Sequence, residues 1–335
     1  MSIHAESRPL ETPLPGGKEG ATVTVEPMVT GTFSSPPILH DSPKGKAGTL
    51  AILRSTRKER EPTPIPCFLI RHPSAGLILV DTGLHPSIAS DPASNLGKFT
   101  TWLMRPHQEP GQDVLSQLRE KGINPADIRM VIFTHLHYDH ASAISEFPEA
   151  TLIVNDVEWK YAATVRSPDF KGYRRQQFDY AFDFRTISFD SDKVSSYASF
   201  GRTLDLFGDG SIRLASTPGH SPGHQSLICR LGDRDLVISG DAIYEESKLE
   251  AGANLPGTMF DEHNYKRSLS ELKRFHETYP SAVITAGHET AFYENAPPPR
   301  LRAQSSGQAP APSPSRATPA SRRVAPSRRG PCTSS

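Results

Sequence analysis

The chain has 335 residues, of which 36% are hydrophobic and 22% are charged, and its 37 basic and 37 acidic residues give a formal net charge of zero. Its 31 prolines are too many for a wholly compact chain, so part of the sequence is expected not to fold. The three cysteines lack paired spacings, and neither a secretory leader nor a membrane-length apolar run is present, which argues against a disulfide scaffold and a membrane protein. We therefore expect a cytoplasmic protein.

Both ends of the chain are predicted to be disordered. Residues 1–20 are rich in Pro and Gly, and residues 297–335 consist mainly of Pro, Ser, Ala and Arg without a periodic apolar pattern. Such segments cannot bury enough apolar surface to offset the entropy lost on ordering. The tail carries seven arginines and no acid, which leaves 30 basic and 37 acidic residues in the rest of the chain. We predict one mildly acidic folded domain over residues 21–296, with no nucleic-acid or membrane partner.

Within this domain, strands come first and then alternate with helices, which is the pattern of sheets covered by helices. Asp113 is placed to cap a helix whose apolar residues share one face, and Gly122 stands where a helix end favours a left-handed residue. The strands that we expect cover residues 21–25, 49–53, 67–70, 77–80, 130–134, 211–216, 235–239 and 282–286.

Four potential metal ligands stand within six residues directly after the expected strand at 130–134: His135, His137, Asp139 and His140. Residues two apart share a face of an extended segment, so His135 and His137 can converge on one ion, whereas Asp139 and His140 require the backbone to turn. Histidine nitrogen and carboxylate oxygen suit zinc and other divalent first-row metals. A site without thiolate ligands is more often catalytic than structural.

Three further candidate ligands each follow a separate expected strand. His220 follows a Pro218-Gly219 turn that would aim its imidazole inward. Asp241 follows the strand at 235–239 and has two oxygens that could bridge two ions, and His288 follows the strand at 282–286. Because each side chain lies just past a strand, several loops can converge on one pocket.

This ordered set, together with Asp81 after an early strand, resembles the metallo-β-lactamase superfamily over essentially all of residues 21–296. Within that superfamily the chain is most similar to N-acyl homoserine lactonases, in residues 80–83 (VDTG), 134–141 (THLHYDHA), 217–226 (TPGHSPGHQS) and 241–244 (DAIY). Tyr244, three residues beyond Asp241, is similar to the lactonase branch in particular. One departure is Ser142-Ala143, because the lactonases usually have two glycines there.

The resemblance implies an α/β fold, namely an αββα sandwich of two mixed β-sheets flanked by helices. It also implies two divalent metal ions, with zinc as the first expectation, although these ligands accept manganese, iron and cobalt as well. Asp81 would orient a ligand histidine. The implied ligands are His135, His137 and His220 for one ion, Asp139, His140 and His288 for the other, and Asp241 as the bridge between them.

The implied activity is the opening of a lactone ring, in an N-acyl homoserine lactone or a related small lactone, by a hydroxide that the two ions share. Tyr244 would stabilise the tetrahedral oxyanion, and Asp139 would pass a proton to the leaving oxygen. His224 has no ligand role in the family and is expected to be structural. The partner is a small-molecule substrate, and no oligomeric state is predicted.

Two segments are candidates for the walls of the substrate pocket. Residues 161–207 hold 11 of the 26 aromatic residues of the chain, which could form an apolar roof or could pack as an inserted element. The second candidate wall is a predicted mobile loop with four large apolar residues. These are Phe99, Trp102, Leu103 and Met104.

Other hydrolases use the same ligand set, so hydrolysis of a lactam or of a cyclic carbamate of the benzoxazolinone type, and cleavage of an acyl thioester, stay open as alternatives. Glyoxalase II normally adds a helical C-terminal domain, whereas this chain is predicted to become disordered within about ten residues after His288, which argues against that domain. Metal-dependent RNases carry an inserted domain and basic surfaces, which this acidic domain lacks. Flavodiiron proteins usually have a glutamate in place of His137. A non-catalytic metal-binding protein would be expected to have lost ligands, whereas all seven are present.

Overall fold

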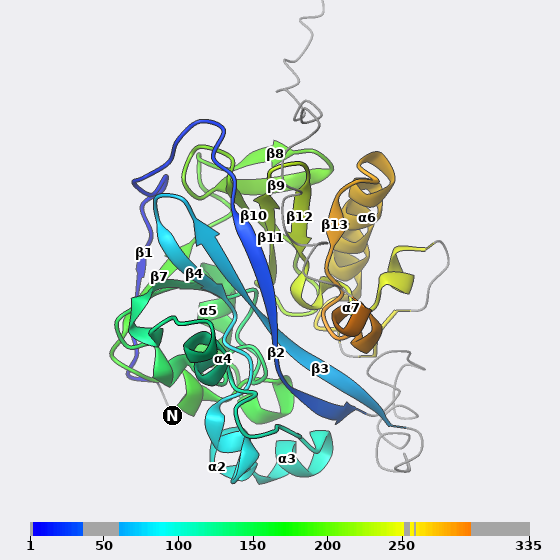
Figure 1. The fold of residues 1–335 in the computed structure, drawn as a ribbon. Coiled ribbons are helices and arrows are strands. Elements are labelled where there is room, and N and C mark those ends of the chain that lie inside the picture. The colour runs from blue at the N-terminus through cyan, green and yellow to red at the C-terminus, as the bar shows by residue number, and fades with distance from the viewer. Residues whose placement is uncertain (1–2, 36–59, 251–254, 258, 296–335) are drawn as a thin grey trace, which may run out of the picture.

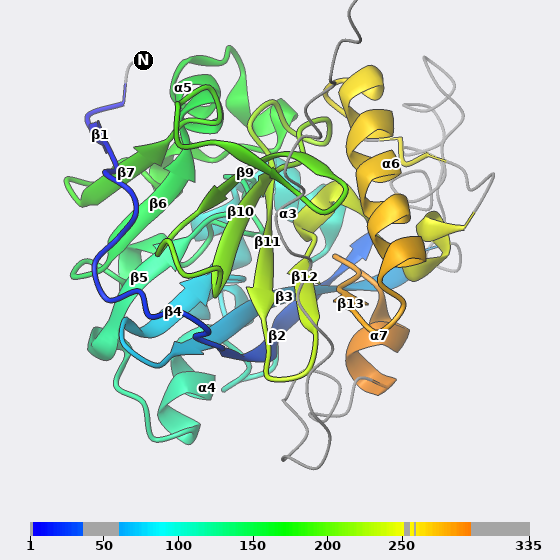
Figure 2. The ribbon, with the colours of Figure 1, turned by 90° about the horizontal axis from the view of Figure 1, so that it is seen from above.

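Two β-sheets pack face to face and carry helices on their outer faces (Figures 1 and 2). The computed structural model describes residues 3–35, 60–250, 255–257 and 259–295. The expected strand at 49–53 and the predicted disordered tail at 297–335 lie outside these residues. The arrangement is the αββα sandwich predicted from the sequence.

The first sheet has seven strands in the order β1-β7-β6-β5-β4-β3-β2. Neighbours from β1 to β4 in this order run parallel, whereas β3 is antiparallel to both β4 and β2, so the sheet is mixed. The strands are β1 (Ser7–Pro9), β2 (Thr24–Ser35), β3 (Glu61–His72), β4 (Gly76–Val80), β5 (Ile128–Ile132), β6 (Thr151–Asn155) and β7 (Asp183–Ile187).

The second sheet has six strands in the order β13-β12-β11-β10-β9-β8. All its pairs are antiparallel except β12 with β13, which makes this sheet mixed as well. The strands are β8 (Ser195–Tyr197), β9 (Phe200–Asp205), β10 (Ile212–Ser216), β11 (Gln225–Arg230), β12 (Asp235–Ile238) and β13 (Val283–Ile284).

The helices connect the strands and cover the sheets. The α-helices are α2 (Pro92–Leu96), α3 (Lys98–Met104), α4 (Val114–Glu120), α5 (Asp156–Thr164), α6 (Glu262–Thr278) and α7 (Thr290–Asn295). Short 3-10 helices are η3 (Pro86–Ala89), η4 (Pro125–Asp127), η5 (Ile144–Glu146), η6 (Pro168–Lys171), η7 (Arg175–Gln177), η8 (Gly240–Ala242) and η9 (Glu246–Leu249). Among the described residues, no helix has both the length and the apolar character that crossing a membrane requires.

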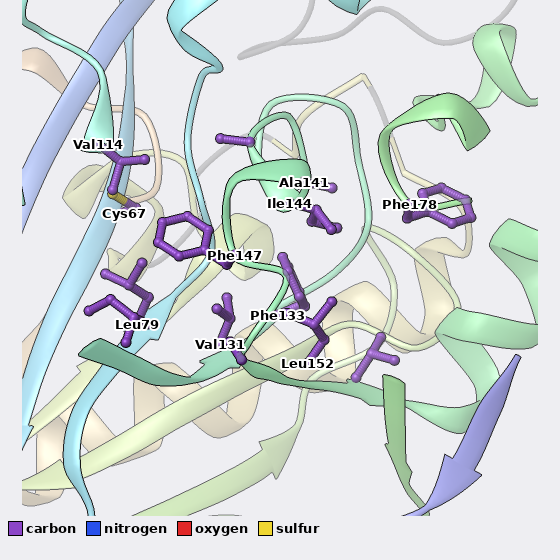
Figure 3. Close-up of a cluster of buried hydrophobic side chains, with 14 of the residues drawn as sticks. Cys67, Leu79, Val114, Val131, Phe133, Ala141, Ile144, Phe147, Leu152 and Phe178 are labelled. Carbon is purple, nitrogen blue, oxygen red and sulfur yellow. The ribbon is translucent and has the colours of Figure 1, made fainter. Parts of the chain in front are cut away.

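Both faces of the first sheet are buried, and β5 shows how the sequence achieves this. Val131 packs outward with Val114 of α4 and Phe147 (Figure 3), while its neighbour Ile132 points to the other face and packs with Leu214 of the second sheet. Successive residues of a strand point to opposite faces, so a continuous apolar run fits a strand that is covered on both sides. The sandwich therefore has one core between the sheets and another outside the first sheet.

Helix α6 covers the outer face of the second sheet. Asp261 caps its first turn by accepting a hydrogen bond from the backbone N–H of Asn264 (2.9 Å). Leu269, Leu272 and Phe275 recur every three to four residues, so they share one face and pack with residues of the second sheet. The helix thereby fixes the loop that follows β10.

Several local predictions are confirmed. Asp113 caps α4 by accepting a hydrogen bond from the Ser116 N–H (3.0 Å), and Gly122 beyond the helix has φ 71°. The strands expected at 67–70, 77–80, 130–134, 211–216, 235–239 and 282–286 correspond to β3, β4, β5, β10, β12 and β13, with ends that differ by a few residues.

Three predictions need correction. Residues 1–20 are not wholly disordered, because β1 adds to the first sheet beside β7, and Arg8 forms an ion pair with Asp183 (2.9 Å). The strand expected at 21–25 starts only at Thr24 and runs on to Ser35 as β2. The loop predicted around Phe99 is the helix α3. Its small and polar residues hid the helical pattern, in which Thr100 and Met104 are the buried positions.

Candidate metal centre

The seven side chains predicted to bind metal come together at the carboxyl ends of four strands. The segment from His135 to His140 follows β5, and the other three residues follow β10, β12 and β13 in the second sheet. Their ligand atoms form three overlapping groups, and the atoms of each group lie within 4.8 Å of one another. The first group is His135, His137 and His220, the second is Asp139, His140 and His288, and a third, His135, His140 and Asp241, links these two.

The carboxylate of Asp241 lies between the two groups. Its Oδ2 is 3.2 Å from Nε2 of His220, and its Oδ1 is 3.2 Å from Nε2 of His140 and 3.1 Å from Nε2 of His288. Oδ2 also lies 3.3 Å from Nε2 of His288, so the carboxylate is close to both groups, as a bridging ligand must be.

The loop that carries His220 is shaped by a close approach to α6. Gly219 adopts φ 137°, and a Cβ at this position would lie 2.3 Å from the backbone N of Tyr265. The hydroxyl of Ser268 donates to the carbonyl of Pro218 (2.7 Å). The Pro-Gly turn predicted from the sequence thus requires its glycine, because the backbone of α6 fills the space that a side chain would need.

Unsatisfied polar atoms in the centre test whether the site suits a metal. Nε2 of His135, Nε2 of His140 and Oδ1 of Asp241 are buried, and none of them makes a hydrogen bond among the described residues, since the 3.2 Å contact between His140 and Asp241 lacks the geometry of one. Buried polar atoms are almost always satisfied in native proteins, and such exceptions indicate an absent ligand or ion. Imidazole nitrogen and carboxylate oxygen are donors that divalent first-row metals accept. The residues present fit two such ions.

Burial dominates the electrostatics of the first group. It lowers the pKa of His135 and His137 well below the usual histidine value, and it lowers the pKa of His220 as well. Neighbouring histidines add to the effect at His135 and His137. These imidazoles are therefore neutral at neutral pH, which is the form that can bind a metal ion.

Carboxylates dominate the second group. Burial lowers the pKa of His140, but Asp241, Asp139 and Asp81 outweigh burial and raise it well above the usual value. At His288 burial acts in the same direction and is again outweighed, chiefly by Asp241. Burial raises the pKa of Asp241, and the histidines His288, His140 and His220 overcome this effect and lower it well below its usual value.

Asp81 holds the second group from behind. Its carboxylate accepts hydrogen bonds from the N–H and the hydroxyl of Thr134 (both 2.8 Å) and lies 2.8 Å from Nδ1 of His140. This contact orients the His140 ring so that Nε2 faces Asp241. Asp81 has φ 58°, a left-handed conformation that Asp tolerates better than most residues. The arrangement supports the predicted orienting role.

The two side chains predicted to act in catalysis lie at the floor of a cavity. Tyr244 is 6% exposed, and its hydroxyl is 3.1 Å from Nδ1 of His220. Its ring centroid lies 5.8 Å from that of His220 and 5.3 Å from that of His288, one residue from each group. Oδ2 of Asp139 is 3.8 Å from Nε2 of both His140 and His288.

The cavity above the centre has a volume of about 800 Å³ and is lined by both predicted walls. Of the aromatic residues in 161–207, Tyr161, Phe170 and Tyr173 line it, whereas others such as Phe178 and Phe184 pack in the core. Phe99, Leu103 and Met104 of α3 also line it, but Trp102, which is 58% exposed, is not among the lining residues. The roof prediction thus holds for part of the aromatic segment.

His224 is buried behind the centre, as expected for a structural residue. Nδ1 lies 3.1 Å from the carbonyl of Thr217, and Nε2 accepts the backbone N–H of Asp241 (3.0 Å). Burial lowers the pKa of His224 to about 3, so the ring is neutral and can accept that hydrogen bond. Sequence reasoning missed that His224 holds Asp241, because no local pattern links residues 17 positions apart.

Ser142 and Ala143 replace the glycines of the lactonases without strain. Neither has a positive φ. The Ser142 hydroxyl accepts the N–H of His85 (3.0 Å) and donates to Oδ1 of Asn95 (2.7 Å), which joins the metal-ligand segment to α2. In this chain a side-chain contact takes the place of the glycines.

Comparison with known proteins identifies the family. The metallo-beta-lactamase superfamily profile matches residues 60–288. The N-acyl homoserine lactonase AttM of Rhizobium radiobacter is 34% identical over 237 residues, which cover 69% of this chain and 84% of that protein. An N-acyl homoserine lactonase of Bacillus cereus is 28% identical over 229 residues, covering 68% of this chain and 81% of that protein.

A solved structure shows the same fold. It is an N-acyl homoserine lactone hydrolase with the product N-hexanoyl-L-homoserine bound at the catalytic metal centre. The TM-score is 0.65 at 23% identity, with 82% of this chain and 96% of that chain covered. These comparisons confirm the predicted fold class and hydrolase class. The chain belongs to the metallo-beta-lactamase superfamily.

Proposed function

We propose that this protein is a cytoplasmic dinuclear zinc hydrolase that opens the lactone ring of N-acyl homoserine lactones. The observation that carries the proposal is the carboxylate of Asp241, whose oxygens lie within 3.2 Å of Nε2 of His220 in one group and of His140 and His288 in the other. The similarity to lactonases over about two thirds of the chain supports the choice of substrate. The seven residues named above would hold the ions, which when bound polarise a carbonyl and lower the pKa of water.

Tyr244 is suited to stabilise the negative charge that develops on the carbonyl oxygen. A tyrosine hydroxyl can accept one hydrogen bond and donate another. If Nε2 of His220 held a metal ion, the ring proton would reside on Nδ1 and would be donated to the Tyr244 oxygen 3.1 Å away. The hydroxyl of Tyr244, which lines the cavity, would donate to the substrate oxygen.

Asp139 is suited to move a proton. Its side chain lines the cavity, and its Oδ2 lies 3.8 Å from Nε2 of both His140 and His288. Asp139 is therefore next to the space for the substrate and to the neighbouring histidines. Cleavage of the ring C–O bond of a lactone produces an alkoxide, which must be protonated to become the hydroxyl group of the hydroxy-acid product. Asp139 would take the proton from the attacking water and deliver it to the ring oxygen.

The shape of the cavity supports a small molecule with a polar head and an apolar tail. The ligand side chains and Tyr244 form the polar floor, while Phe99, Tyr161 and Phe170 form apolar walls. Pockets with a few polar groups and an apolar lining are typical of small-molecule sites. The lactone ring would lie on the floor and the acyl chain along the walls.

A ring-opening panel on metal-loaded protein tests the proposal. The substrates are homoserine lactones of several acyl lengths, simple lactones, a β-lactam, benzoxazolinone and an acyl thioester, with product formation followed by chromatography. We expect the homoserine lactones to be opened fastest, chelation to abolish the activity and zinc to restore it. Turnover of the thioester alone, or of benzoxazolinone alone, would contradict the lactonase assignment.

A further inference from the structure

Glu158 is a carboxylate that lies wholly inside the protein, in the first turn of α5. It has no exposed surface. Its Oε1 accepts hydrogen bonds from the Leu136 N–H (3.0 Å) and the Tyr173 hydroxyl (2.9 Å). Its Oε2 accepts hydrogen bonds from the Ser221 hydroxyl (2.7 Å) and the Gly223 N–H (3.0 Å). Four donors thus converge on one side chain.

The donors belong to the segments that carry the first ligand group. Leu136 stands between His135 and His137, and Ser221 directly follows His220. The two loops come from different sheets, since one follows β5 and the other follows β10. One carboxylate therefore joins both loops: it accepts the backbone N–H of Leu136 from the first loop, and the hydroxyl of Ser221 and the backbone N–H of Gly223 from the second.

Tyr173 extends the same network to the outer side of His137. The two rings meet edge to face, with centroids 4.8 Å apart. The preceding Gly172 accepts the backbone N–H of Tyr138 (2.8 Å), and a Cβ on Gly172 would lie 2.6 Å from Cδ2 of His137. His137 is thus held between its own loop and the segment of Gly172 and Tyr173, and the Tyr173 hydroxyl ties this segment to Glu158.

Such a carboxylate is expensive to bury. The groups that act on it in the described part of the chain are neutral donors, so no cation compensates its charge. Glutamate is almost never fully buried unless it is satisfied. An apolar residue of similar size would leave all four donors unpaired, which indicates that the carboxylate serves the loops that it joins.

We infer that Glu158 is a positioning residue that fixes the geometry of His135, His137 and His220 by tying both of their loops and the Tyr173 segment to one carboxylate. Asp81 orients His140 in the second group, and Glu158 has the corresponding role in the first. The inference rests on the proposed metal centre, and it concerns one of the two ions more than the other.

The test is the metal affinity of Glu158→Gln, measured by competition with a chromophoric chelator and by the visible spectrum of the cobalt(II)-loaded protein. Glutamine keeps the size but has one acceptor oxygen, so its amide N–H groups face two donors. We expect one of the two ions to bind roughly 10- to 100-fold more weakly, as for other groups that orient ligands, and the cobalt spectrum to change. The second ion should bind nearly as in the wild type.

Two milder variants provide the same readout if Glu158→Gln does not fold. Tyr173→Phe and Ser221→Ala each remove one donor, one from each oxygen of Glu158, and should weaken the same ion by smaller factors. Asp113→Ala, which removes the cap of α4 away from the centre, is the control for a general loss of stability and should leave both affinities unchanged.

The outcomes are distinct. A folded Glu158→Gln variant with wild-type affinities and cobalt spectrum would overturn the inference, as would unchanged affinities in both milder variants if Glu158→Gln does not fold. Because the readout is metal binding, the inference survives a wild type that binds two ions but opens no lactone. A wild type that binds no metal would overturn both proposals.

Discussion

The two groups of candidate ligands are built mainly from histidine, yet their surroundings differ. His135, His137 and His220 lie in a region where burial lowers the pKa of each, and neutral donors around Glu158 hold their loops. His140 and His288 lie against carboxylates, which raise their pKa values despite burial. The same ligand type therefore has a lowered pKa on one side of Asp241 and a raised pKa on the other.

The difference shows that proton affinity in this centre is determined by neighbours rather than by the ligand itself. The lowered pKa values of the first group favour the neutral imidazole that binds a metal, whereas the raised pKa values of the second group make its protons compete more strongly with an ion. Binding of the second ion should therefore depend more steeply on pH than binding of the first.

Removal of Asp241 should have the largest effect, because this residue faces both groups. We expect Asp241→Ala to lose at least one ion per chain by elemental analysis and to lose measurable lactone hydrolysis. Asp235→Asn, at the start of the strand that leads to Asp241, is the matched control and should retain both ions. Two ions retained in Asp241→Ala would show that the two groups do not share a bridging ligand.

Loss of the Tyr244 hydroxyl should have the next largest effect. Tyr244→Phe keeps the ring between His220 and His288 but removes the donor, so kcat should fall by up to roughly 10²-fold with a smaller change in KM. Metal content should not change. Tyr197→Phe, whose hydroxyl bonds to Asp235 away from the centre, should behave like the wild type. An unchanged kcat in Tyr244→Phe would remove this residue from the proposed mechanism.

Substitution of Asp81 should distinguish the two groups. Asp81→Asn keeps the shape but weakens the contact with His140, so we expect one ion to be bound about 10- to 100-fold more weakly. The ion that is bound more weakly should differ between Asp81→Asn and Glu158→Gln. When both variants are loaded with cobalt(II), each should therefore change a different part of the spectrum. Identical spectra in the two variants would mean that the groups do not act separately.

The pH dependence of stability should also report on the buried side chain of His224. His224 is neutral in the folded protein down to a pH of about 3, whereas in the unfolded chain it takes up a proton below about pH 6.5. Its lowered pKa therefore stabilises the fold above about pH 6.5, and this stabilisation is lost as the pH falls through that window. In His224→Gln, the pH slope of the free energy of unfolding should decrease by about 1.4 kcal/mol per pH unit. The measurement is urea unfolding of both metal-free proteins, and equal slopes would contradict it.

The sequence was most informative where the signal is local. The spacing from His135 to His140 and the single ligands after β10, β12 and β13 can be recognised because each follows an apolar run. Contacts between distant residues left no such signal. Glu158 lies 22 residues from Leu136 and 63 from Ser221, so nothing near it in the sequence marks it as a residue of the centre.

The same limit explains the misjudged N-terminus. Composition predicts that residues 1–20 do not become ordered through their own contacts. Residues near Arg8 are ordered by partners about 175 positions away, including Asp183. A strand of three residues has too little sequence to reveal its pairing.

β1 also has a practical consequence. Its backbone pairs with the outer side of β7, which would otherwise present a row of unsatisfied N–H and C=O groups. A chain shortened by its first ten residues would expose that row, and exposed rows of this kind recruit strands from other molecules. Loss of solubility, rather than loss of activity, is therefore the expected first sign of N-terminal trimming, and an affinity tag placed directly before Ser7 risks the same result.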